Sequence, residues 1–247
     1  MASAAIGRRG AVFARGILVT VHDLYGGSWP LQPLELYLRY GRDLDVQPFR
    51  YHPRRQDLSA SGERTVLVVD QPNDVVAATD EVLRAELAEL LRSLKPHTAD
   101  DGVNFVTHGY GALVLREAFL RVDWNYTKAK VVMLAPPNRG LQYYRSMKSN
   151  VGFAGYGGVA AEELATMSSE MLDLRLGKLP RRCYPLVVSG SLSFNPFNQA
   201  NYPNDGLIAL DETALPGEFR QRVVAAPHYL IPSHPLVFDL VRGFLEA

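Results

Sequence analysis

One stretch organises the whole chain: Val103-Asn104-Phe105-Val106-Thr107-His108-Gly109-Tyr110-Gly111-Ala112-Leu113-Val114. An apolar segment, 103–107, runs straight into a short turn with glycine at 109 and 111, and a second apolar segment begins immediately behind it. Short apolar runs bounded by turn residues are typical of buried strands, whereas a longer apolar run favours a helix. The stretch therefore predicts a strand, a sharp turn and a helix in direct succession.

The same alternation of strand and helix patterns extends along the rest of the chain. We expect strands at 17–22, 46–51, 103–107, 130–135, 185–189 and 223–225, a further extended segment at 65–69, and helices at 31–42, 79–94, 111–121 and 236–245. Strands that alternate with helices form right-handed βαβ units, so the sequence predicts an α/β fold, a mostly parallel sheet of about six strands with helices on both faces. Ligands of such sheets bind at the carboxyl ends of the strands.

The composition is that of one globular domain without a charge preference. The chain has 247 residues, 47% of them apolar, which is enough for one sizeable core, and we place a single domain over 16–247. Basic and acidic residues number 26 each, so no net charge draws the chain to nucleic acid or to an anionic membrane. No apolar run approaches the ~20 residues of a transmembrane helix. The single cysteine, Cys183, suits a reducing intracellular compartment, and we expect it to be a packing residue and not a reactive thiol.

Two segments lie outside the regular alternation. Residues 1–15 form a basic N-terminal extension with Arg8, Arg9 and Arg15 and no acid, as in an organellar transit segment, although an ordinary chain terminus is the alternative. The extension favours the mitochondrial matrix over the cytoplasm, and we expect it to dock on another protein. Between 141 and 182 we expect a small cap insertion over the site; the alternative is a helix that only packs on the sheet.

Segments that follow the expected strands are similar to those of one enzyme family. They are an elbow at His108-Gly109-Tyr110-Gly111, a His-Gly-like loop from Val21 to Trp29, an A-P-P-N-x-G segment from Met133 to Gly140, an acid loop at Asn204-Asp205-Gly206 and a base loop at Pro232-Ser233-His234. On these segments the chain resembles the lipase- and esterase-like branch of the α/β-hydrolase superfamily, from about Gly16 to Ala247. The resemblance implies the α/β-hydrolase fold and ancestry in acyl-ester hydrolysis, with nucleophile, acid and base in that chain order.

The resemblance assigns a role to each catalytic position, and one role is unfilled. The G-x-S-x-G elbow of the family holds a serine nucleophile, but Gly109 occupies the serine position here. Asp205 corresponds to the acid that orients the base, and His234 corresponds to the base. His228 is a competing candidate for the base because it directly follows the last expected strand.

The oxyanion-binding positions also depart from the family. They are Asp23 and Leu24 in the first loop and the backbone amide of Tyr110, and Asp23 replaces the glycine of the His-Gly pair. An ionised Asp23 at ~4 Å from a developing oxyanion would repel it by about 4 kcal/mol at an effective dielectric constant near 20. Thr107 replaces the first elbow glycine. The nucleophile position of an elbow has a strained backbone that costs about 1–3 kcal/mol, and glycine at 109 relieves this strain because it has no Cβ. Several departures together favour natural loss of catalysis over a single engineered change.

Three functions remain open from the sequence. The first is a catalytically inactive α/β-hydrolase-like protein that acts as a structural or interaction subunit of a larger protein assembly. The second is a non-catalytic binder of an acyl or other apolar molecule in the former substrate pocket. The third is a carboxylic-ester hydrolase in which serine has been changed to glycine. The resemblance calls for neither a cofactor nor a metal.

Overall fold

The structure, a computed structural model, describes residues 17–23, 29–39, 67–69, 87–88, 91–92, 103–124, 128–148, 153–198 and 203–247. The strands are β1 (Ile17–Val21), β2 (Leu67–Val69), β3 (Val103–His108), β4 (Ala129–Leu134), β5 (Cys183–Gly190) and β6 (Arg220–Val224). The α-helices are α1 (Gln32–Arg39), α3 (Gly111–Leu120), α4 (Gln142–Met147), α5 (Phe153–Thr166), α6 (Ser169–Leu176) and α7 (Pro235–Glu246). Two short 3-10 helices are η1 (Leu210–Thr213) and η2 (His228–Ser233).

The strands form one sheet in the order β2-β1-β3-β4-β5-β6, and every pairing in it is parallel. Thr107 near the end of β3 lies opposite Val21 of β1 and Met133 of β4, so the elbow leaves the middle of the sheet. Strands covered on both faces are buried along almost their whole length, as β3 and β4 are. The expected parallel α/β fold is confirmed.

Most of the expected elements are present, and the rest cannot be compared. The extended segment at 65–69 takes an edge position as β2. The expected strand at 46–51 lies outside the described residues. Only 87–88 and 91–92 of the expected helix at 79–94 are described, and there Leu87 and Leu91 are buried.

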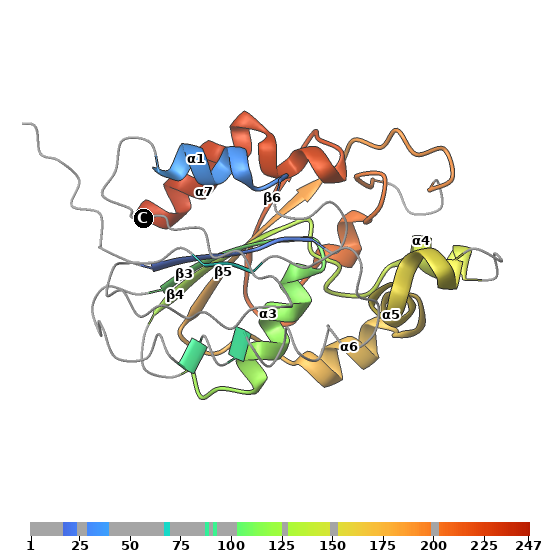
Figure 1. The fold of residues 1–247 in the computed structure, drawn as a ribbon, viewed down its shortest axis with the longest axis horizontal. Coiled ribbons are helices and arrows are strands. Elements are labelled where there is room, and N and C mark those ends of the chain that lie inside the picture. The colour runs from blue at the N-terminus through green and yellow to red at the C-terminus, as the bar shows by residue number, and fades with distance from the viewer. Residues whose placement is uncertain are drawn as a thin grey trace, which may run out of the picture.

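Helices cover both faces of the sheet (Figure 1). On one face α1 lies against α7, where the rings of Tyr37 and Phe238 stack at 5.0 Å between centroids. On the other face α3 packs beside α6, and Phe105 of β3 meets Phe119 and Trp124 edge to face. No helix that the structure describes is long and apolar enough to span a membrane.

The segment 141–182 contains α4, α5 and α6. Figure 1 shows α4 and α5 beyond the carboxyl ends of the strands, with α6 running back beside α3. Tyr110 at the elbow donates its hydroxyl to Glu163 Oε2 of α5 at 2.7 Å. Arg175 of α6 pairs with Glu163 and, at 2.6 Å, with Glu117 of α3. The segment is therefore joined to the elbow, and its action as a cap stays a prediction.

Candidate functional site

The elbow is built by two glycines with different physical requirements. Gly109 has φ +51°, in the left-handed region that favours glycine. Gly111 opens α3, and a Cβ there would stand 2.6 Å from the carbonyl oxygens of Val21 and His22. The helix can therefore start against β1 only if residue 111 lacks a side chain. The strand, turn and helix predicted for 103–114 follow one another directly.

The carboxylate of Asp23 occupies the space of a side chain at position 109. A Cβ on Gly109 would lie 2.1 Å from Asp23 Oδ1 and 2.2 Å from Asp23 Cγ. Asp23 Oδ1 accepts a hydrogen bond of 2.8 Å from the backbone N–H of Tyr110. That amide is the one that the resemblance assigns to the oxyanion, and it lies at the N-terminus of α3, where a negative charge is favoured. The expectation that Asp23 faces the site agrees with this geometry.

His228 links Asp23 to Asp205. Its Nε2 lies 3.0 Å from Asp23 Oδ2, and its Nδ1 lies 2.9 Å from Asp205 Oδ2. All three side chains are buried. Nucleophile position, imidazole and acid are thus arranged in the order of a hydrolase triad, with a carboxylate in place of a hydroxyl.

The two carboxylates hold His228 in its charged form. Burial by itself would lower the pKa of His228, but the charges and hydrogen bonds of Asp205 and Asp23 outweigh burial and raise it to about 10. Burial raises the pKa of Asp23, yet the hydrogen bond and charge of His228 leave it well below its usual range. The three buried side chains therefore form a row in which an imidazolium lies between two carboxylates.

Asp205 is positioned by its own loop, which follows β5. Its Oδ1 accepts hydrogen bonds from the backbone N–H groups of Leu207 at 3.0 Å and Ile208 at 2.7 Å. Its carbonyl oxygen accepts from the backbone N–H of His228 at 2.9 Å. This second contact fixes the start of η2 against the acid loop and aims the imidazole at the carboxylate.

The expected pairing of Asp205 with His234 is wrong. His234 is the N-cap of α7, and its Nδ1 accepts from the backbone N–H of Leu236 at 3.2 Å. The position beside the acid belongs to His228, which the sequence offered only as a competitor. Its place directly behind β6 was the available indication, because the carboxyl ends of parallel strands gather at one edge of the sheet.

Two further elbow side chains lie behind the triad positions. The ring of His108 stacks on His228 at 4.7 Å between centroids, and its Nε2 is 3.2 Å from the carbonyl oxygen of His228. Burial and the charge of His228 lower the pKa of His108 to about 4, so the ring is neutral. Within the described part of the chain, His108 Nδ1 and Thr107 Oγ1 are buried without a hydrogen-bond partner. Leu24, the remaining oxyanion-loop position, lies outside the described residues.

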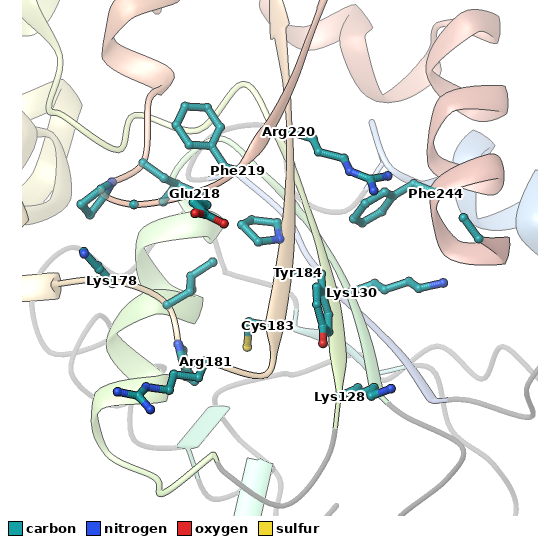
Figure 2. Close-up of a pocket in the computed structure, with 17 residues that line it drawn as sticks. Lys128, Lys130, Lys178, Arg181, Cys183, Tyr184, Glu218, Phe219, Arg220 and Phe244 are labelled. Carbon is teal, nitrogen blue, oxygen red and sulfur yellow. The ribbon is translucent and has the colours of Figure 1, made fainter.

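A separate cavity of about 690 Å³ opens at the opposite, amino-terminal edge of the sheet (Figure 2). Most of its polar lining is basic, including Lys130 and Arg220. Cys183 also lines it, and burial raises the pKa of this thiol to about 12, which agrees with a packing role. The cavity is therefore distinct from the elbow.

Comparison with known proteins identifies the fold. No protein-family model matches the sequence, and no curated protein is similar to it. The product of gene lin2722 from Listeria innocua has a TM-score of 0.62 and 14% identity over 94% of both chains. The mature lipase BlEst2 from Bacillus licheniformis has a TM-score of 0.59 and 15% identity over 96% of this chain and 94% of its own. The metagenomic carboxyl esterase MGS0156 has a TM-score of 0.57 and 16% identity over 89% of this chain and 66% of its own. Identities this low show the fold alone: the chain has the α/β-hydrolase fold.

Proposed function

We propose that this protein is a catalytically inactive α/β-hydrolase-like protein that acts as an interaction subunit of a larger protein assembly. One observation carries the first half of the proposal. The Asp23 carboxylate takes the space of the missing side chain at Gly109 and the hydrogen bond of the Tyr110 amide. An acyl ester would find neither a hydroxyl nucleophile nor a free donor at that amide.

The expected loss of rate is large. Removing the serine of a working triad costs about 10⁶ in kcat, as in subtilisin. Removing one oxyanion donor costs a further ~10²–10³ in such enzymes. Asp23 also opposes the reaction electrostatically. Its negative charge lies where the negative charge of the oxyanion would develop. These effects support an inactive protein.

An exposed, well-anchored loop supports the second half. Phe194 and Phe197, in the segment 191–198, have exposed fractions of 77% and 82%. Asn195 holds this segment by donating to the carbonyl oxygen of Gly206 at 2.8 Å, and Asn198 donates to that of Leu207 at 3.0 Å. Aromatic side chains held outward by a fixed loop are costly in water and are frequent contacts in protein interfaces.

The assembly is tested by the mass of the endogenous protein. The tagged full-length chain, expressed in its own cells and analysed by sedimentation and native mass spectrometry, should be found in a complex heavier than one chain. Phe194→Ser with Phe197→Ser should release it, while Leu174→Ser, a control at a side chain 89% exposed on α6, should not. A chain that sediments alone, or that hydrolyses p-nitrophenyl acyl esters well above the buffer rate, would overturn the proposal. Bound lipid extracted from a lone, inactive chain would favour the acyl-binding alternative instead.

A further inference from the structure

Three side chains at the elbow are spaced as metal ligands. Asp23, His108 and His228 each offer one ligand atom, and these atoms lie within 4.8 Å of one another in a fully buried cluster. Imidazole nitrogens and a carboxylate oxygen suit zinc and related divalent transition metals. We propose that Asp23, His108 and His228 bind one divalent transition-metal ion, with zinc as the expected occupant. The proposal does not depend on the interaction role above.

One pair of donor atoms already has nearly the spacing of zinc ligands, whereas His108, which lies within 4.8 Å of both, would have to turn out of its stack on His228. Donor atoms at ~2.0–2.1 Å from a tetrahedral zinc ion stand about 3.3 Å from one another. Asp23 Oδ2 and His228 Nε2 are 3.0 Å apart, and a proton lies between them in the absence of an ion. Exchanging that proton for zinc would open the pair by only a few tenths of an ångström.

The remaining ring nitrogens have the partners that ligating histidines require. A metal-bound histidine almost always donates its other ring N–H to a carboxylate or a backbone carbonyl. His228 Nδ1 faces the Asp205 carboxylate at 2.9 Å, and His108 Nε2 faces the carbonyl oxygen of His228 at 3.2 Å. These contacts leave His228 Nε2 and His108 Nδ1 as ligand atoms. His108 Nδ1 is a nitrogen that is buried and unpartnered among the described residues.

A divalent ion also balances the buried charge. Two carboxyl groups, those of Asp23 and Asp205, lie against the one imidazole of His228, at 3.0 and 2.9 Å. No lysine or arginine in the described part of the chain forms an ion pair with either carboxylate. An isolated buried charge is costly unless it is paired or coordinates a metal. With a divalent ion and two neutral imidazoles the cluster would be neutral.

A metal site would also explain why residue 109 is glycine. Any residue with a Cβ at position 109 would displace Asp23, whose Oδ1 lies 2.1 Å from the Cβ position. The three protein ligands leave a fourth position of a tetrahedral ion open for water. The change from serine to glycine would then exchange a nucleophile for a metal ligand brought in by the neighbouring loop.

The test uses the full-length protein, stripped with a chelator and then titrated with ZnCl₂. Calorimetry and native mass spectrometry should find one zinc per folded chain, and X-ray absorption should find N/O ligands at ~2.0–2.1 Å that include imidazole. His108→Ala and Asp23→Ala should each abolish stoichiometric binding. Asp205→Asn, which alters a positioning residue, should weaken binding about 10–100-fold.

The control is His234→Ala, which removes a histidine outside the cluster and should leave zinc binding unchanged. Circular dichroism must show that each variant is folded, and His108→Gln replaces His108→Ala if that variant is not. The proposal is overturned if the folded wild type binds no zinc, or if its zinc has no imidazole ligand. It is equally overturned if His234→Ala abolishes binding or if His108→Ala retains it.

Discussion

The carboxylate of Asp23 lies where residue 109 would carry its side chain, with Oδ1 only 2.1 Å from the Cβ position of Gly109. These residues are far apart in the chain, yet the position of each depends on the other. Gly109 admits Asp23, and Asp23 then uses the Tyr110 amide and the imidazole of His228. The glycine at 109 and the aspartate at 23 therefore form one structural unit.

This relationship predicts coupled stability effects at the two positions. Gly109→Ala should lower the free energy of unfolding by about 1–3 kcal/mol for the left-handed backbone alone, and further because its Cβ collides with Asp23. In an Asp23→Ala background the same substitution should cost less, since only the backbone strain remains. Urea denaturation of the two single variants and the double variant measures the coupling. Equal costs in both backgrounds would contradict the collision.

Ester hydrolysis should return only when both positions are changed. Gly109→Ser alone forces its Cβ against the Asp23 carboxylate and keeps that charge beside the elbow, so Gly109→Ser with Asp23→Gly should be faster by about 100-fold, the effect of one oxyanion donor. The rates are measured with p-nitrophenyl esters of several acyl lengths.

The reactivated variant can also identify the base. Adding His228→Ala should reduce hydrolysis to the buffer rate, because His228 contacts Asp205. Adding His234→Ala should leave it nearly unchanged. The opposite pattern would restore His234 to the role that the resemblance gave it.

Glu212 should make stability depend on pH. Burial raises its pKa to about 7 from an ordinary value of 4.5, despite hydrogen bonds from the backbone N–H groups of Ala209 and Gln142. A carboxyl whose pKa is raised on folding stabilises the protein below about pH 4.5, and this stabilisation is lost as pH rises through 7. Relative to Glu212→Gln, the wild type should lose up to about 3 kcal/mol of unfolding free energy across that interval. Denaturation curves at pH 4.5, 6 and 8 measure the difference, and a constant difference would refute the prediction.

Asn138 should be important for stability, although it touches no triad position. It is buried, accepts from Arg116 at 3.1 Å and donates to the carbonyl oxygen of Thr213 at 2.8 Å. Asn138→Ala would leave a buried guanidinium and a buried carbonyl short of partners, at a cost of about 2–4 kcal/mol. Asn195→Ala, at a half-buried side chain of the exposed loop, should cost about 1 kcal/mol. Thermal or urea denaturation compares the two, and similar costs would contradict the argument.

The elements could be predicted from the sequence because their causes are local. The strand at 103–107, the glycines of the turn and the helix behind it differ from the structure by at most one residue at each end. The periodicities of strands and helices repeat over a few residues, so a single stretch contains the information. The parallel sheet followed from the alternation of such stretches. The segment 65–69 was recognised as extended, but its edge position depends on which strand it meets.

The chemistry of the elbow depends on distances between side chains in space, which cannot be read from their separation in the sequence. Both His228 and His234 follow β6, and the contacts of His228 with the carboxylate and the carbonyl oxygen of Asp205 select between them. The sequence by itself predicts that Gly109 occupies the position of a nucleophile, because the residue type is visible in the motif that resembles the elbow. Only the folded sheet shows that the Asp23 carboxylate fills the space beside Gly109 and that His108 lies against His228. The reason is geometric: neighbouring parallel strands bring their carboxyl ends together, whatever the number of residues between them.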